Sequence, residues 1–220
     1  MNLKQFFEDI LQDPAAFLRE LKNDPSLANA IQPQTDDVHI MSRLADGNIK
    51  TGFDKIGIVN LLLDNGADPR LVKIHGESML HWAVSYGRYP FELMQRIMDY
   101  GIDVNLACKC ELVTPLHVAC QAGNLDGILF LLLNGANPNV AMKNGQTPLH
   151  TLVMSNPVCH GLDILQNAAK MLVEYGADQS ATMTYKNELY TPADLVRRWI
   201  SYHLRRPDQY NFQSLYDTFR

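Results

Sequence analysis

The chain has 220 residues, of which 46% are hydrophobic and 20% are charged, and its formal net charge is −5. This composition excludes a disordered polymer and supplies enough apolar side chains for a continuous core. The negative charge argues against nucleic acid or an anionic membrane as the main partner. The longest aliphatic runs are far too short to cross a bilayer, so we expect contact with neither.

The first 35 residues predict short helices of a different pattern from the rest of the chain. Asp13-Pro14 and Asp24-Pro25 each pair an N-cap residue with proline at the first helical position. Apolar residues recur at helical spacing upstream, at Leu3, Phe6, Phe7, Ile10 and Leu11. We predict two or three helices that form an N-terminal cap over residues 1–35. The alternative is an adaptor that recruits cellular machinery through Leu3 to Leu21.

Two phrases recur with a common period through the middle of the chain. The first reads SMLHWAV, TPLHVAC and TPLHTLV, and it opens 36 and then 33 residues apart, at Ser78, Thr114 and Thr147. The second reads NGAD, YGID, NGAN and YGAD, with steps of 35, 34 and 41 residues between its glycines, Gly66, Gly101, Gly135 and Gly176. A period of this size predicts a solenoid, in which each unit buries its apolar face against its neighbours.

Each copy of the repeat predicts two helices joined by a short turn. Thr114 can cap a helix that has proline at its first position. Leu116 and Ala119 then face inward, and Gly123 ends the helix. The second helix, about Leu125 to Asn134, is apolar around its circumference, which predicts that it is sandwiched between neighbouring copies.

The period breaks in two places. The longest step between glycines contains an insertion, residues 156–167, which we place between the two helices of that copy. Near the C-terminus TPADLV, from Thr191, looks like a divergent copy in which Asp194 replaces the histidine. Residues 180–220 are therefore predicted to form a divergent last repeat with a C-terminal helical cap.

The repeated phrase resembles the ankyrin repeat. The resemblance implies an all-α ankyrin-repeat solenoid of stacked helical hairpins, with short β-hairpin or turn connections and helical caps at both ends. The repeats would fill residues 36–190. A degenerate first unit would cover about 36–69, followed by units at about 70–104, 105–138 and 139–179.

Histidine recurs at the same place in three copies, as His81, His117 and His150. The resemblance implies that each imidazole ties its helix start to the neighbouring hairpin by hydrogen bonds. A residue repeated in every full copy suits this structural role better than a unique catalytic one.

Cysteine is the other candidate for chemistry. Cys108 and Cys110 have a spacing found in metal sites, but the predicted fold separates them from Cys159 and His160. No phosphate-binding loop, nucleophile elbow or zinc-protease motif is present. We therefore predict no enzymatic activity, no metal and no cofactor. Irregularly spaced cysteines indicate reduced thiols and a cytoplasmic protein, or one in the host cytosol if it is a secreted effector.

The predicted function is binding of a partner protein by a monomeric, non-catalytic scaffold. The resemblance implies that the partner lies on the concave side, against hairpin tips and first helices. Residues expected there are Ile74, His75, Glu77, Tyr86, Cys110, Glu111, Val113, Gln121, Lys143, Asn144, Gln146, Met154, Tyr190, Arg198 and Trp199. Aromatic and arginine side chains usually dominate such interfaces, so Tyr86, Tyr190, Arg198 and Trp199 are the expected anchors.

This scaffold is expected to act as a regulator or as a secreted bacterial effector. The alternative is an enzyme subunit with activity in its termini or in the insertion, residues 156–167.

Overall fold

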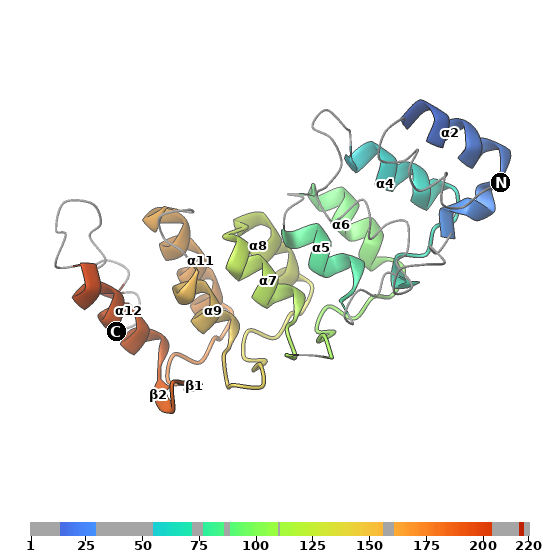
Figure 1. Ribbon diagram of the computed structural model, residues 1–220. Helices are drawn as coiled ribbons and strands as arrows, with labels where there is room; N and C mark the ends of the chain where they lie inside the picture. Colours follow the sequence, from blue (N-terminus) through green and yellow to red (C-terminus); the bar gives the residue numbers. More distant parts are fainter. Residues whose placement is uncertain are drawn as a thin grey trace. The chain divides into compact units, whose positions relative to one another are not determined.

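The computed structural model describes residues 14–29, 55–71, 77–85, 89–109, 111–155, 161–203 and 216–217. The chain divides into two compact units, Met1–Asp103 and Val104–Arg220, and each is described by itself. Within the described ranges the structure is mostly helical, in agreement with the predicted fold class (Figure 1).

The first unit opens with two short helical segments that both start at a proline. Helix α2 spans Pro14–Asn23, and the 3-10 helix η1 spans Pro25–Asn29. The Asp24 carboxylate accepts a hydrogen bond from the Ser26 amide at 3.1 Å, as expected for a cap before Pro25. Both starts were predicted from the sequence. The apolar stripe upstream lies outside the described residues, so the adaptor alternative stays a prediction.

The first unit continues with helix α4, Lys55–Asp64, and the 3-10 helix η2, Pro69–Leu71. Helices α5, Met79–Ser85, and α6, Phe91–Met98, then pack together as a hairpin. Arg96 joins this hairpin to α4, because its guanidinium contacts the Asp64 carboxylate at 2.5 Å and the Asn60 side-chain oxygen at 3.1 Å. Helix α4 thus takes the place of the second helix in the first repeat.

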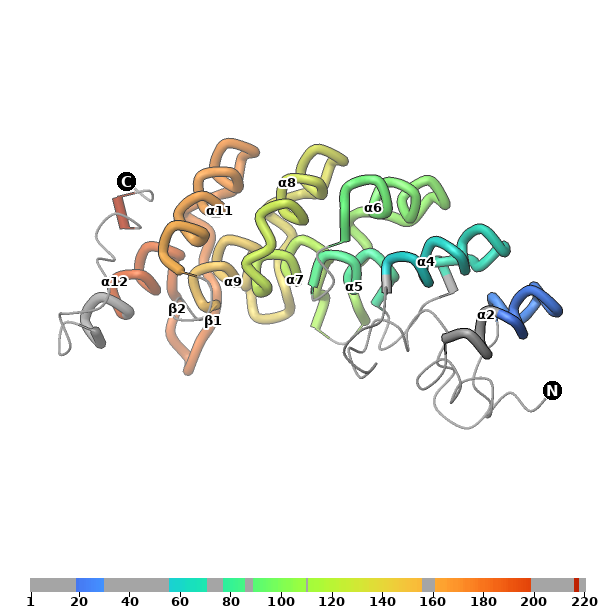
Figure 2. The backbone as a smooth tube through the Cα atoms, turned by 90° about the horizontal axis from the view of Figure 1, so that it is seen from above, coloured from blue at the N-terminus to red at the C-terminus, as the bar shows by residue number. Residues whose placement is uncertain are grey.

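The described part of the second unit holds two complete helix pairs followed by helix α12. The pairs are α7, Pro115–Ala122, with α8, Leu125–Leu133, and α9, Pro148–Met154, with α11, Leu162–Glu174. Helix α12 spans Pro192–His203. Helix α9 packs between α7 and α12, and α11 packs on α8, so first and second helices form two rows (Figure 2).

Helix α8 is apolar along its length but is not fully enclosed. Ile128, Leu131 and Leu132 are buried, but Leu133 is 59% exposed and Leu129 is half-buried. Leu129 and Leu133 lie one turn apart on the same face of the helix. Its neighbours α7 and α11 cover the other faces. The helix is therefore packed against neighbouring elements on part of its circumference and carries an exposed apolar stripe on the rest.

The insertion is also shorter as a loop than expected. The structure begins α11 at Leu162, so residues 162–167 belong to a helix rather than to the connection between helices. The physical reason is an amphipathic pattern, since Leu165, Ala168, Ala169 and Leu172 recur at helical spacing and are buried. The extra residues have lengthened the second helix of this copy. Residues 156–160 lie outside the described part.

A β-hairpin precedes α12. Strand β1, Met183–Tyr185, pairs antiparallel with β2, Glu188–Tyr190, and Tyr185 faces Glu188 across the ladder. The two turn residues, Lys186 and Asn187, have φ values of 51° and 64°. Positive φ at both positions is typical of a type I′ turn, which matches the twist of the strands.

Candidate functional site

Three hairpin connections, which we call fingers, precede the first helices of the second unit. Finger 1 covers residues 108–113, finger 2 covers 142–146, and finger 3 is the β-hairpin, 183–190. Finger 1 is closed by the Cys108 amide, which donates to the Val113 carbonyl at 2.8 Å. Finger 2 is closed by the Met142 amide, which donates to the Gln146 carbonyl at 2.8 Å.

Backbone hydrogen bonds join one finger to the next. The Lys143 amide of finger 2 donates to the Glu111 carbonyl of finger 1 at 3.2 Å. The Thr184 amide of finger 3 donates to the Asn144 carbonyl of finger 2 at 2.8 Å. These contacts hold the fingers in one stack on the same side of the helices, as Figure 1 shows for β1 and β2 beneath α12.

The helix that follows each of the first two fingers starts with a reciprocal cap. The Thr114 backbone amide donates to Nδ1 of His117 at 3.2 Å, and the Thr114 hydroxyl lies 2.8 Å from the same nitrogen. The next copy repeats this geometry at Thr147 and His150, with distances of 3.3 and 2.8 Å. All four side chains are buried. The predicted N-caps are thus confirmed, and histidine completes each one.

The other ring nitrogen reaches the next finger. Nε2 of His117 lies 3.1 Å from the Gln146 carbonyl, and Nε2 of His150 lies 3.0 Å from the Tyr190 carbonyl. Because Nδ1 accepts from an amide, the Nε2–H donates, and the ring must be neutral. Each histidine therefore ties its own helix start to the neighbouring hairpin, as the resemblance implied.

Burial sets the protonation state of these rings. It lowers the pKa of His117 from 6.5 to about 4, against a smaller opposing effect of the Gln146 carbonyl. Burial likewise lowers the pKa of His150, and the carbonyls of Tyr190 and Ala181 oppose it. A neutral imidazole held at both nitrogens has no free atom for proton transfer, so its role here is structural.

The last copy keeps the cap but changes the residue. The Asp194 carboxylate accepts from the Thr191 amide at 3.0 Å and from the Thr191 hydroxyl at 2.7 Å. These hydrogen bonds lower the pKa of Asp194. Its other oxygen contacts Arg197 of the same helix at 3.2 Å. Asp194 therefore replaces the histidine Nδ1 as the acceptor in the cap. Among the described residues it makes no contact like that of the histidine Nε2 with a following finger.

Asparagine forms a second link between copies, which the sequence analysis missed. The Asn139 side chain donates to the Gly176 carbonyl at 2.8 Å and accepts from the Asp178 amide at 2.7 Å. Asn105 makes the same pair of contacts with the Gly135 carbonyl and the Asn137 amide. A signal existed, because both asparagines stand four residues after a repeat glycine.

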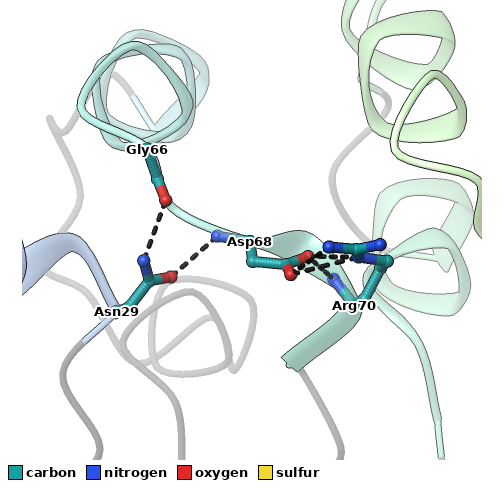
Figure 3. A network of polar contacts seen from close by, with 4 residues as sticks. All are labelled: Asn29, Gly66, Asp68 and Arg70. Atoms are coloured by element: carbon teal, nitrogen blue, oxygen red, sulfur yellow. Dashed lines mark hydrogen bonds and ion pairs between the residues drawn. The ribbon is translucent and has the colours of Figure 1, made fainter.

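The same asparagine link occurs in the first unit, before the first recognisable repeat. Asn29 of η1 donates to the Gly66 carbonyl at 2.8 Å and accepts from the Asp68 amide at 2.7 Å (Figure 3). Segment α2–η1 therefore occupies the position of a preceding copy's second helix and loop. Arg70 stands four residues after Gly66, where the copies at Gly101 and Gly135 have asparagine, and it binds the Asp68 carboxylate instead.

Finger 3 carries a cluster of aromatic and cationic side chains. The rings of Tyr185 and Tyr190 are 6.4 Å apart, edge to face. The Arg198 guanidinium lies 5.7 Å from the centre of the first ring and 5.5 Å from the second, and it donates to the Tyr190 hydroxyl at 2.8 Å. The ammonium of Lys186 lies 5.4 Å from the Tyr185 ring. The Tyr190 hydroxyl donates to Glu188.

The structure places the remaining expected binding residues at different positions along the fingers and helices. Glu111, Lys143 and Asn144 are exposed on fingers 1 and 2, and Gln121 and Met154 are exposed near the ends of α7 and α9.

Two expected binding residues, Val113 and Gln146, are half-buried. The Gln146 side chain donates to the Thr151 hydroxyl at 2.9 Å, so it braces its own copy. Glu77, also half-buried, belongs to the first unit. Ile74, His75, Tyr86, Cys110 and the Trp199 side chain lie outside the described part.

Two exposed residues that the sequence analysis did not select lie on the fingers. Leu189 of β2 is 69% exposed, and Leu112 of finger 1 is 41% exposed with a φ of 62°. A leucine with positive φ is unusual, because its Cβ crowds the backbone there. The signal in the sequence was only that each leucine sits beside an expected binding residue.

Metal or thiol chemistry finds little support among the described residues. Within those ranges no three His, Cys, Asp or Glu side chains come together as a metal site. Cys108 and Cys120 are buried free thiols, and burial raises the pKa of Cys120, which makes it a poor nucleophile. Cys159 and His160 fall outside the described part.

Residues 49–142 match the family model for ankyrin repeats, in three copies. The paired helices, the histidine-completed caps and the fingers continue the same pattern beyond residue 142. This part of the chain is built from ankyrin repeats.

Similar proteins contain this repeat in different settings. The chain is 33% identical to alpha-latrocrustotoxin-Lt1a of Latrodectus tredecimguttatus over 44% of its length, which is 7% of that protein. It is 30% identical to the mouse B-cell lymphoma 3 protein homolog over 57% of its length, 27% of that protein. An ankyrin repeat protein of Rickettsia bellii is 28% identical, over 66% of this chain and 53% of its own length. The chain thus spans about half of these relatives or much less.

Ankyrin repeats are generally protein–protein interaction modules, and proteins built from them are typically not enzymes. Within the part of the chain that the structure describes, no helix has the length and apolarity needed to cross a membrane.

Proposed function

We propose that the chain is a non-catalytic scaffold that binds a partner protein through the finger side of its second unit. The observation that carries this proposal is the cluster on finger 3, where Arg198 lies against the rings of Tyr185 and Tyr190. Aromatic and arginine side chains on a rigid support are the residues that most often dominate binding energy.

The support beneath the cluster favours binding over catalysis. The fingers are joined by backbone hydrogen bonds, and His150 fixes the Tyr190 carbonyl from below. A surface held in this way loses little conformational entropy when a partner binds. The titratable side chains of His150 and Asp194, by contrast, already form hydrogen bonds in the caps of α9 and α12. A role as regulator or as secreted bacterial effector concerns where this binding takes place and would use the same surface.

The experiment compares two double variants of the full chain. Tyr190→Ala with Arg198→Ala removes the finger 3 cluster, and Tyr175→Ala with Lys170→Ala removes an exposed tyrosine and an exposed cation from α11 in the opposite row. A partner captured by the unaltered chain is purified, and its affinity for each variant is measured by calorimetry. We expect the first variant to bind at least about tenfold more weakly and the second to bind normally.

Equal binding by the first variant and the unaltered chain contradicts the proposed surface. A larger loss in the α11 variant would place the interface on the second helices instead. Thermal unfolding of both variants serves as the control, because Lys170, Tyr175 and Arg198 are exposed, Tyr190 is half-buried, and none of the four belongs to the buried core.

A further inference from the structure

We infer that finger 3 binds an extended segment of the partner as an added strand along β2, and that this segment places a carboxylate beside Arg198. This inference rests on the proposed function, because it specifies the kind of partner that the finger side accepts. Strand addition of this kind obtains its affinity from backbone hydrogen bonds and its specificity from alternate side chains.

The register of the hairpin decides which backbone groups are available. A two-residue turn makes Tyr185 and Glu188 a hydrogen-bonded pair, so the next pair, Thr184 and Leu189, is not hydrogen-bonded across the ladder. The Thr184 amide indeed points away from β2, toward the Asn144 carbonyl at 2.8 Å. By the same alternation the amide and carbonyl of Leu189 point outward from β2.

The outer edge of β2 is the open end of the finger stack. Finger 1 meets finger 2 at Glu111 and Lys143, and finger 2 meets finger 3 at Asn144 and Thr184. Beyond the ladder itself, no described residue bonds the Leu189 amide or carbonyl. An incoming strand would therefore continue a contact that the chain already makes twice.

The exposure of the Leu189 side chain also supports an added strand along β2. Proteins usually protect a free strand edge with charged residues, proline or a covering segment. Leu189 lies in the middle of this edge, is 69% exposed and is the most exposed large hydrophobic residue in the described part of the chain. Such a residue costs solubility unless a partner covers it.

Charge specifies the sequence of the incoming strand. Successive side chains of a strand point to opposite faces, so Tyr190 and Glu188 lie on one face of β2 and Leu189 lies on the other. Arg198 and Lys186 flank the tyrosine face. A strand that alternates an aliphatic residue with an acidic one would place the aliphatic side chain on Leu189 and the carboxylate beside Arg198.

The test uses a library of random short peptides, selected on the full chain. We expect enriched peptides that alternate aliphatic and acidic residues. Leu189→Pro removes the outward amide without removing a ladder bond and should weaken their binding at least about tenfold. Thr184→Val, on the inner strand, is the matched control and should leave binding unchanged. In the free protein, the Leu189 amide should exchange rapidly with deuterium.

The possible results distinguish a failure of the added strand from a failure of the proposed function. Binding that depends on Tyr190 and Arg198 but not on the Leu189 amide overturns the added strand and leaves the finger surface in place. Peptides insensitive to all three residues, or no enriched peptide, count against both. Slow exchange at Leu189 in the free chain would show that the chain or a second copy already covers the edge, and would overturn the inference.

Discussion

The inner copies and the last copy of the second unit start their first helices in different ways. Helices α7 and α9 begin at caps completed by His117 and His150, and each ring also bonds a carbonyl of the next finger. Helix α12 begins at a cap completed by Asp194, which bonds only residues of its own copy. The cap is kept, and among the described residues Asp194 makes no link to another copy.

This difference separates the groups that join neighbouring copies from the groups that the proposed function assigns to a partner. In the inner copies, the buried rings of His117 and His150 join neighbouring copies, and finger 2 is held from both sides, at Lys143 by finger 1 and at Asn144 by finger 3. In the last copy, finger 3 is held from one side by Asn144 and His150, while its outer edge carries exposed Leu189. The residues that hold the copies together are thus adjacent to, but separate from, those that the proposed function assigns to a partner.

The largest expected effect on stability comes from removing an inner histidine. His117→Ala leaves the buried Thr114 amide without its partner and removes one of the two hydrogen bonds to the Gln146 carbonyl, which keeps its bond from the Met142 amide, and it should cost about 3 kcal/mol of unfolding free energy. Asp194→Ala, at a partly exposed cap, should cost about 1 kcal/mol. Urea denaturation measures both. Equal losses would show that the link between copies adds nothing to the cap.

Acid should produce an effect of similar size in the unaltered chain. The pKa of His117 is about 4 in the folded chain against an ordinary 6.5, so the unfolded chain binds protons first as pH falls. Above pH 6.5 the neutral His117 ring contributes its full share of the unfolding free energy, on the order of 3 kcal/mol. This contribution is lost as the pH falls from 6.5 to about 4.

The acid response should also separate the two kinds of cap. The pKa of Asp194 is lowered from 3.8, so its contribution persists through that window and is lost only at lower pH. Amide exchange followed residue by residue should show α7 and α9 weakening before α12. Simultaneous weakening of all three helix starts would contradict the distinction.

A smaller effect should follow from adding a methyl group where the fingers touch. Gly145 has a φ of +85°, and a Cβ there would lie 2.7 Å from the Thr182 carbonyl oxygen. Gly145→Ala should therefore cost about 2 kcal/mol or more. Gly135 has the same φ with open space around it, so Gly135→Ala should cost only about 1 kcal/mol. Equal losses of unfolding free energy in the two variants would show that the backbone around Gly145 is not in close contact with the Thr182 carbonyl.

The smallest effect should come from the asparagine link. Asn139→Ala removes two hydrogen bonds, to the Gly176 carbonyl and from the Asp178 amide, at an exposed site. We expect a loss of about 1 kcal/mol, measured by thermal or urea unfolding. Gln121→Ala, which removes an exposed amide side chain near the end of α7, serves as a comparison for general substitution effects. A loss no greater than in that control would mean that the link is dispensable.

Local signals in the sequence predicted most of the fold. Thr114, its proline and the histidine three residues later define the start of a helix, and Gly123 defines its end. Each signal acts within one turn of its helix end, so it could be recognised without knowing the neighbouring copies. The prolines Pro14 and Pro25 likewise marked the starts of α2 and η1. The replacement of histidine by Asp194 was visible because the repeat supplied the position to compare.

Features that depend on distant neighbours were harder to predict. Leu133 is exposed because α8 has packing partners on some faces only, which its apolar composition cannot reveal. The asparagine link joins residues 30 to 39 positions apart, so its partners are not evident in any one copy. Leu189 stands out only when the pairing of β1 and β2 is known.

The most direct measurement is hydrogen exchange of the full chain with and without its purified partner. The account predicts that protection on binding is concentrated in residues 183–190, with the Leu189 amide among the strongest, and extends to the neighbouring tips of fingers 1 and 2. Protection confined to α8 and α11, with residues 183–190 unchanged, would contradict the claim that the finger side of the second unit is the binding surface.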